Sequence, residues 1–313
     1  MFLYSTIDKT EYQQLMMAIK SLNEEKSKIC SDEVYRLGLK TKRYLNFLTI
    51  DGIKSKLKRR KQFGHMKPMP DLPGAVNDRS VCNYFSDDKI AVYTCITGGY
   101  DDIIEPLFVP NNCDFYAITD FELPQDSKWR RIDVDEYEEV QGLNNVLKNR
   151  YFKFFPHIVF KDYKYSIYID GNIKVCSDLT EHINRISTYG ISFFKHSKRS
   201  CAYTEADTCE QLRKESSDRL HELTNYLEKE RFPHNYGLIE CNFIVRDHSS
   251  KICSEIMEDW WEMFNRFAKR DQLSLPYVLY KRGIKVEELV TLGNNVHTEY
   301  SIEFVQHNKK KYF

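Results

Sequence analysis

The sequence predicts an α/β protein in which a mostly parallel β-sheet is covered on both faces. Beyond residue 88, short apolar segments alternate with segments of helical period, which is the pattern of strands connected through helices. Hydrophobic residues make up 42% and charged residues 29% of the 313 residues, which is enough for a globular core. Glycine is scarce, at 12 residues, so glycine-rich and collagen-like architectures are excluded.

The first 88 residues are expected to form a helical, basic extension that ends in a linker. Apolar residues keep a helical spacing from Tyr12 to Leu22, and a second helix is expected at about 33–48. Eleven basic residues and one acid lie between Arg36 and Lys67. Three prolines and two glycines between 64 and 88 then predict the linker.

The basic segment from Lys54 to Lys61 has two interpretations. It is either a solvated helix face or a patch for an anionic membrane surface, worth about 1 kcal/mol per basic residue. The chain carries 46 basic and 46 acidic residues, so no nucleic-acid partner is expected. The nine cysteines form no C-x-x-C pair, and no apolar run approaches the ~20 residues of a membrane span. We therefore expect a cytoplasmic protein with reduced thiols, either soluble or peripheral at the inner face of a membrane.

Residues 89–290 are expected to form the α/β domain, with 291–313 as a C-terminal tail. Strands are predicted at 89–96, 113–119, 165–170, 191–195 and 239–245, and a helix at 143–155. A second helix is marked by Leu220, Leu223 and Leu227. A long amphipathic helix is marked by apolar residues in steps of three and four, namely Ile252, Ile256, Trp260, Met263 and Phe267. Ligands of such sheets bind where the strands end, so the residues after each strand are the candidates for function.

The loop after the first strand is one candidate. It contains Gly98 and Gly99, which would let the backbone approach a ligand closely, and then Tyr100 and Asp101. The tyrosine ring could stack on a base and the acid could hold ribose hydroxyls. The alternative is an ordinary turn between a strand and a loop.

Two further candidates follow later strands. Asp120 follows the second strand, and Asp170, Gly171 and Asn172 follow the strand at 165–170. An acid, one spacer and an amide oxygen can hold Mg²⁺ or Mn²⁺ against a diphosphate. The same three residues are also typical of a tight hairpin turn between two strands.

A polar cluster follows the strand at 191–195. His196, Arg199 and Glu205 lie within ten residues, a mixture that a solvated loop does not need. Asp271 comes after the long helix and is either a site residue or simply the N-cap of the helix through Leu279. The dinucleotide-binding, Walker, zinc-protease and lipase motifs are all absent, as is any metal-spaced Cys/His cluster.

Five of these segments, in this order, resemble a known family. The segments are 92–102, 166–173, 196–205, 235–240 and 270–274, and together they cover roughly 89–282. The family is a group of GT-A-like glycosyltransferases formerly treated as a domain of unknown function, with bacterial polysaccharide members and plant pectin- and mucilage-related members. The resemblance implies a Rossmann-like GT-A catalytic domain at 89–290, a nucleotide-sugar donor, UDP-linked, and a glycan acceptor, which includes lipid-linked glycans.

The resemblance also implies roles for individual residues. Lys148 and Arg150, on the helix before the strand at 165–170, would reach the phosphates or the sugar. Asp170 would be the first acid of a D-x-D motif, beside the metal ion and the diphosphate, with Gly171 and His196 also near the donor. The residues expected to face the nucleotide are Thr94, Ile96, Gly98, Gly99, Tyr100, Asp101 and Asp120.

One position departs from the family pattern. The third D-x-D residue is Asn172, which offers an oxygen ligand without the charge. Two unit charges 4 Å apart interact by about 4 kcal/mol at an effective dielectric constant of 20, so the missing anion matters for a divalent ion. Three alternatives follow. The metal ion is held more weakly by Asp170 and Asn172, its coordination is completed by a further ligand such as Glu205 or His307, or no metal ion binds. Lys198 and Arg199 would in that case help to neutralise the diphosphate.

The expected reaction is transfer of a sugar to a hydroxyl group of a growing polysaccharide, capsule or lipopolysaccharide glycan. If the reaction inverts the anomeric centre, Asp271 is the first choice of base and Glu240 the second; if it retains it, no strong base is needed. Two other classes remain open from the residues. One is an Asp-dependent nucleotidyltransferase or phosphohydrolase, and the other is a non-catalytic carbohydrate-binding or scaffold protein on a degenerate transferase fold.

Overall fold

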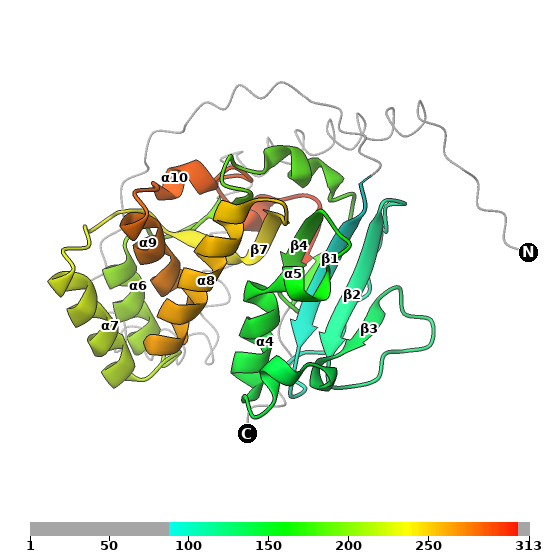
Figure 1. The fold of residues 1–313 in the computed structure, drawn as a ribbon, viewed down its shortest axis with the longest axis horizontal. Helices are drawn as coiled ribbons and strands as arrows, with labels where there is room; N and C mark the ends of the chain where they lie inside the picture. Colours follow the sequence, from blue (N-terminus) through cyan, green and yellow to red (C-terminus); the bar gives the residue numbers. More distant parts are fainter. Residues whose placement is uncertain (1–87, 306–313) are drawn as a thin grey trace, which may run out of the picture. The chain divides into compact units, whose positions relative to one another are not determined.

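The computed structural model describes residues 88–305, which form a mixed α/β domain (Figure 1). The predicted N-terminal helices, the linker, the segment from Lys54 to Lys61 and His307 lie outside the described residues. The strands are β1 Ile90–Ile96, β2 Cys113–Thr119, β3 Arg130–Asp133, β4 Tyr165–Ile169, β5 Ile173–Val175, β6 Ile191–Lys195, β7 Ile239–Asp247 and β8 Ile302–Phe304. The α-helices are α4 Asn145–Phe154, α5 Pro156–Val159, α6 Ala202–Gln211, α7 Ser217–Lys229, α8 Lys251–Arg266, α9 Asp271–Lys281 and α10 Val286–Leu289, and the 3₁₀ helices are η1 Val134–Glu136, η2 Glu138–Val140, η3 Thr180–Arg185 and η4 Val296–Thr298.

The main sheet has the strand order β3-β2-β1-β4-β7-β6. The first four of these strands are parallel to one another, whereas β7 runs antiparallel to both β4 and β6. All seven residues of β1 are buried, as expected for a central strand covered on both faces. The predicted mostly parallel α/β sheet is therefore confirmed, and each predicted strand is found within two residues of its expected bounds.

The two faces of the sheet are covered differently. Tyr93 on β1 and Tyr168 on β4 belong to one apolar cluster, together with side chains of α4, α8 and α9. Figure 1 shows α4 and α8 in front of the strands on this face. Val92 and Ile167, which alternate with them, belong to a second cluster with side chains of η3, β5 and β8. Helices thus cover one face, and the small sheet β5–β8 and 3₁₀ turns cover the other.

The hairpin interpretation of residues 170–172 is wrong. β4 pairs with β1 and β7, while β5 pairs antiparallel with β8, 127 or more residues further on in the chain. Residues 170–172 therefore carry the chain out of the main sheet into a second one. Residues 291–305, expected as part of a tail, contain β8, and Gly293 also forms a bridge to Phe194 of β6.

The long helix α8 is confirmed, with a small change in its buried stripe. Ile256, Trp260 and Met263 are buried as expected, but Ile252 is 43% exposed and Cys253 is buried instead. The 3.6-residue period explains this, because the stripe that contains Trp260 passes through 253 and 256/257 rather than 252. No α-helix within 88–305 is long and apolar enough to cross a membrane.

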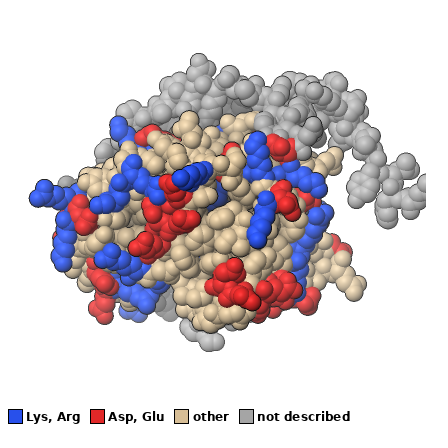
Figure 2. Space-filling view, viewed as in Figure 1, with Lys and Arg blue, Asp and Glu red and all other residues tan. Residues whose placement is uncertain are grey.

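Charged side chains of both signs are interspersed over the face seen in Figure 2, in keeping with the net charge of zero. The seven cysteines between 88 and 305 are all unpaired thiols, and all but Cys176 are buried. Within the described part of the chain, the expectation of reduced, buried cysteines is met.

Candidate active site at the carboxyl ends of the strands

The loop after β1 joins the ends of two strands to the start of α4. Gly98 has a φ of +65° and donates its N–H to the Asp120 carboxylate, at 2.7 Å, just beyond the end of β2. The Thr97 hydroxyl donates to the Asn145 carbonyl oxygen at 2.8 Å, in the first turn of α4. The predicted meeting of Gly98 and Asp120 at one edge of the sheet is present in the structure.

Substituting Gly98 with alanine is expected to destabilise this loop, since a Cβ would lie 2.1 Å from Asn145 Nδ2 and the left-handed backbone also disfavours a side chain. Gly142→Ala is a matched control, with a φ of +76° and open space around the Cβ position. Urea unfolding should show that Gly98→Ala lowers the free energy of unfolding by about 1 kcal/mol or more beyond the loss in Gly142→Ala. Equal losses would mean that contact with Asn145 does not restrict this position.

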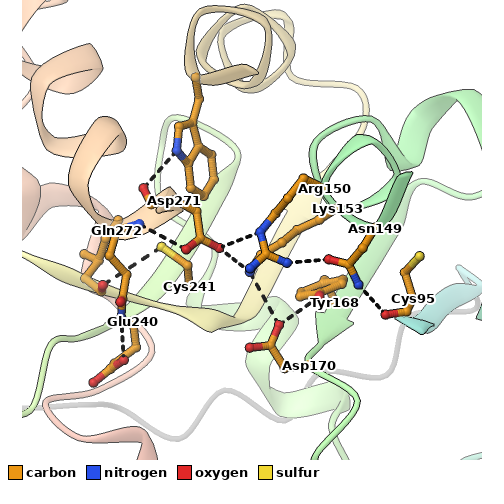
Figure 3. A network of polar contacts seen from close by, with 12 residues as sticks. Cys95, Asn149, Arg150, Lys153, Tyr168, Asp170, Glu240, Cys241, Asp271 and Gln272 are labelled. Carbon is orange, nitrogen blue, oxygen red and sulfur yellow. Dashed lines mark hydrogen bonds and ion pairs between the residues drawn. The ribbon is translucent and has the colours of Figure 1, made fainter. Parts of the chain in front are cut away.

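A buried lysine forms the centre of the site. Lys153 of α4 is 1% exposed, and its Nζ lies 2.6 Å from Asp271 Oδ2 and 3.4 Å from Asp170 Oδ1 (Figure 3). The Tyr168 hydroxyl donates to the same Asp170 oxygen at 2.8 Å, and Lys153 Nζ lies 4.8 Å from the centre of the Tyr168 ring. Carboxylates from two distant segments thus converge on one ammonium group. These ion pairs offset the cost of burying the charge of Lys153.

A second cation supports the same aspartate. Arg150 Nε lies 3.5 Å from Asp271 Oδ2, and the guanidinium also donates to Asn149 Oδ1. Asn149 in turn donates to the Cys95 carbonyl oxygen at the end of β1 (Figure 3). Burial alone would lower the pKa of Arg150, but Asp271 raises it, so this side chain stays charged.

Asp271 is held as a carboxylate. Burial alone would raise its pKa, but Lys153, Arg150 and Arg270 together lower it well below the usual range. A carboxylate of such low pKa is a weak proton acceptor. Asp271 is the first residue of α9 and follows the N-cap Arg270, so the simple N-cap interpretation is wrong. Its position suits charge stabilisation and orientation of a cation or a hydroxyl group.

A second polar cluster lies where β6 ends. His196 Nδ1 accepts hydrogen bonds from the backbone N–H groups of Lys198 and Arg199, at 3.2 and 3.1 Å. This pattern assigns the proton to Nε2, which lies 3.8 Å from Glu205 Oε2 and 4.0 Å from Glu240 Oε1. Burial lowers the pKa of His196 against the opposing effect of the two glutamates, so the ring is neutral near pH 7.

The two clusters are joined through α9. Gln272 Nε2 donates to Glu240 Oε2 at 2.9 Å, and Gln272 directly follows Asp271 (Figure 3). Glu240 also accepts hydrogen bonds from the backbone N–H and the hydroxyl of Ser197, both at 3.3 Å. Glu205, at the start of α6, forms an ion pair with Arg199. Glu240 therefore has neutral partners, whereas Asp271 has cationic ones.

The structure brings most of the predicted site residues together. Asp170, Asp271 and Arg150 share the first cluster, and His196, Arg199, Glu205 and Glu240 share the second. Asp101 is buried beside Gly171, since a Cβ on that glycine would lie 3.5 Å from Asp101 Oδ2. Tyr100 is 50% exposed, and burial together with the charges of Asp101 and Asp170 raises its pKa.

Other predicted residues lie elsewhere. Lys148 forms its ion pair with Asp135 on η1 instead. Thr94 and Ile96 are buried within β1, where Ile96 packs beneath Gly171. The backbone carbonyl oxygen of Asn172 accepts a hydrogen bond from the backbone N–H of Val305 at 2.9 Å, and its side-chain Nδ2 donates to the Val305 carbonyl oxygen at 3.5 Å.

Sequence reasoning missed Lys153, Tyr168, Asn149 and Gln272. Lys153 lies three residues after Arg150, a spacing that puts both on one side of a helix, and this was the signal available. Tyr168 lies two residues before Asp170 and therefore on the same face of the chain.

The residues at the end of β4 offer oxygen ligands of the kind that Mg²⁺ and Mn²⁺ take. Asp170 is one-third exposed at its side chain, Asn172 has an amide oxygen and Asp101 lies alongside. A separate group of metal-ligand type, Glu181, His182 and Glu299, has its ligand atoms within 4.8 Å of one another. In that group Glu181 also pairs with Arg185 at 2.8 Å, and Glu299 accepts from the Ser301 hydroxyl at 3.0 Å.

An α/β sheet with cations and carboxylates gathered where its parallel strands end has the form of a glycosyltransferase-like domain. The chain belongs to the TOD1/MUCI70 glycosyltransferase-like domain family, whose profile matches residues 62–307. This confirms the family resemblance and the GT-A-like fold expected from the sequence. A comparison with curated protein sequences finds no match.

Several solved structures resemble the fold at low sequence identity. The apo structure of the bifunctional glycosyltransferase WbbM is 13% identical, with a TM-score of 0.41 over 69% of this chain and 40% of that one. Mouse xyloside xylosyltransferase 1 in its apo form is 11% identical, with a TM-score of 0.38 over 64% and 83%. The mannosyltransferase Ktr4p from S. cerevisiae is 13% identical, with a TM-score of 0.31 over 71% and 74%. This chain thus spans less than half the length of WbbM.

Proposed function

We propose that the protein transfers a sugar from a nucleotide-sugar donor, UDP-linked, to a hydroxyl group of a glycan acceptor. The observation that carries the proposal is the buried Lys153, held between Asp170 and Asp271 at the carboxyl end of β4. With Arg150 beside it, this cluster fixes two cations, paired with two carboxylates, where a diphosphate would leave. Fixed charge of this kind needs no rearrangement when the leaving group develops its own charge.

The residues divide between the two substrates. The loop from Gly98 to Asp101 and Asp120 would hold the nucleotide, and Asp170 and Asn172 would hold a divalent cation, which when bound would neutralise the diphosphate. Glu240 would act on the acceptor hydroxyl, since its partners are neutral hydrogen-bond donors and a neutral imidazole. Asp271 would hold Lys153 in place rather than accept a proton. A retaining reaction would use the same charges without needing Glu240 as a base.

The test is a panel of nucleotide sugars offered to the purified chain, with and without Mn²⁺, with release of the nucleoside diphosphate measured. Asp170→Asn should reduce turnover by about 100-fold or more, because it removes a charge beside the reacting diphosphate. Asp162→Asn is the matched control, since Asp162 is exposed in the turn just before the N-terminal end of β4. Full activity of Asp170→Asn, or no turnover with any donor, would contradict the proposal.

The same assay separates the other classes. Binding of a donor without turnover would indicate a carbohydrate-binding or scaffold protein, which Asn172 in place of an acid favours. Release of inorganic phosphate or pyrophosphate would indicate a phosphohydrolase or nucleotidyltransferase. The proposal places the protein in the cytoplasm with the segment from Lys54 to Lys61 at an anionic membrane, and liposome binding before and after charge reversal of that segment would test this part.

A further inference from the structure

A buried arginine binds the helix that carries Lys153. Arg246 is the penultimate residue of β7, and it is 1% exposed. It forms no ion pair with any carboxylate within residues 88–305, and its Nε has no hydrogen-bond partner in that part of the chain. A buried charge without a counter-ion is costly, so another feature of the fold has to compensate the charge of Arg246.

The partners of Arg246 are neutral oxygen atoms at the C-terminal end of α4 and on β1. Its Nη2 donates to the Lys153 carbonyl oxygen at 2.6 Å, and its Nη1 donates to the Tyr93 hydroxyl at 3.2 Å. The Tyr93 hydroxyl in turn donates to the Phe152 carbonyl oxygen at 3.1 Å. One guanidinium group therefore binds two successive carbonyl groups of α4, the first directly and the second through Tyr93.

The sequence explains why these carbonyl groups need a donor from outside the helix. The last carbonyl groups of an α-helix have no N–H group of the same helix to accept from. Phe152 would next accept from the N–H of residue 156, but that residue is Pro156, which has none and which begins α5. The negative end of the α4 dipole also favours a cation at this point. The end of α4 thus compensates the charge of Arg246 in place of a carboxylate.

The same contact fixes the residue at the centre of the candidate site. The carbonyl oxygen of Lys153 is bound by Arg246, and its ammonium group is bound by Asp271 and Asp170, at 2.6 and 3.4 Å. Arg150 lies on the same helix, three residues earlier. Because α4 has only ten residues, a shift of its last turn would displace Lys153 directly and would disturb Arg150 as well.

We propose that Arg246 is a positioning residue for sugar transfer, which fixes the last turn of α4 so that the Lys153 ammonium group faces the leaving diphosphate. Since Arg246 is buried, it acts through α4 rather than by touching a substrate. Misplacing a charge that stabilises the transition state lowers kcat more than it raises KM. The positioning role rests on the proposed function, whereas the attachment of α4 to the sheet by Arg246 does not.

Three variants of the full chain test the positioning role by the release of nucleoside diphosphate. In Arg246→Met, kcat should fall about tenfold or more, while KM for the donor should change by no more than about threefold. Arg246→Lys should recover part of kcat, since one ammonium group can donate to the Lys153 carbonyl oxygen but cannot bind Tyr93 in the same forked geometry. Tyr93→Phe removes only the link to Phe152, so it should lower kcat less than Arg246→Met does.

A second measurement does not depend on turnover. Hydrogen exchange of residues 145–155, followed by mass spectrometry, should be about tenfold faster in Arg246→Met than in the wild type, because the end of α4 has lost its donors. Ile183→Ala is the matched control, since Ile183 is 5% exposed and belongs to the apolar cluster on the opposite face of the sheet. It should lower the urea midpoint but leave both kcat and the exchange of 145–155 unchanged.

The outcomes separate the positioning role from the proposed function. A folded Arg246→Met variant with the kcat of the wild type would overturn the positioning role, because a purely structural residue changes stability alone. Unchanged exchange of 145–155 would overturn the attachment of α4 by Arg246. If the wild type turned over no donor, the proposed function and the positioning role would both fail, and the exchange result would decide the attachment. If Arg246→Met did not fold, Arg246→Lys and Tyr93→Phe would provide the same comparisons.

Discussion

Replacing Lys153 with methionine is expected to lower the free energy of unfolding by about 3–5 kcal/mol, because a buried carboxylate loses its closest cation. Asp271 is 5% exposed, and Arg150, its remaining partner, lies farther away, at 3.5 Å against 2.6 Å for Lys153. Urea unfolding at pH 7 measures the loss. Lys148→Met is the control on the same helix, and its half-exposed ion pair with Asp135 is worth about 0–1 kcal/mol.

The double variant Lys153→Met/Asp271→Asn sharpens this prediction. Removing both charges leaves no unpaired buried ion, so the double variant should be more stable than the sum of the two single losses indicates. Additive losses would mean that the two side chains do not stabilise each other. Turnover should be lost in both variants that lack Lys153, because each has lost one of the two cations of the proposed diphosphate site.

The pH dependence of this effect has a definite sign. Cations lower the pKa of folded Asp271, so its ionised form adds stability above the unfolded value, about 3.9. That contribution is lost as the pH falls through the lower folded value. The gap in stability between the wild type and Lys153→Met should therefore narrow as the pH is lowered below 4. A constant gap would contradict the assignment of the low pKa to Lys153.

Replacing Trp260 with alanine is expected to lower the free energy of unfolding by about 3–5 kcal/mol. This side chain is fully buried, and its ring centre lies 4.4 Å from that of Phe154. Its indole N–H donates to the Asp271 carbonyl oxygen and to the Ser274 hydroxyl, both at 3.1 Å. The loss therefore combines a cavity with two missing hydrogen bonds at the start of α9.

Trp261→Ala is the matched control for this prediction. The neighbouring tryptophan is only partly buried, although it also contacts Phe154. Thermal and urea unfolding should show that Trp261→Ala lowers the free energy of unfolding by much less than Trp260→Ala does. Trp260→Phe should fall between them, since it keeps a ring and removes the N–H. Similar losses for the two alanine variants would mean that the core beneath α8 readily repacks.

Local pattern was sufficient for five of the six strands of the main sheet, because each of these carries its own apolar signal. The edge strand β3, with the sequence Arg-Arg-Ile-Asp, carries none and was missed. The apolar run of β1 and the apolar residues on one face of β4 predict burial of these strands without knowledge of their partners. β5 and β8 have three residues each and pair across most of the domain, so no local signal separates them from loops. The direction of β7 likewise depends on how the chain returns to the sheet rather than on its own residues.

The site was predicted as far as acids at strand ends could indicate it. Asp170 was found in this way and Asp271 through the family resemblance. Lys153 was not found, since a lysine among aromatic residues of a helix is ordinarily expected at the surface. Its burial depends on carboxylates 17 and 118 residues away in the chain. Only the assembled fold brings those charges together, and so only the structure distinguishes Lys153 from Lys148.

The adjacency of Asp271 and Gln272 limits how such a protein can diversify. One residue supports the cations proposed for the donor, and the next supports the glutamate proposed for the acceptor. Any substitution that rotates or shifts the first turn of α9 displaces both supports at once. Preference for a new acceptor therefore has to arise from the surrounding loops. The start of α9 has to stay unchanged, because it supports both the donor residues and the acceptor residues.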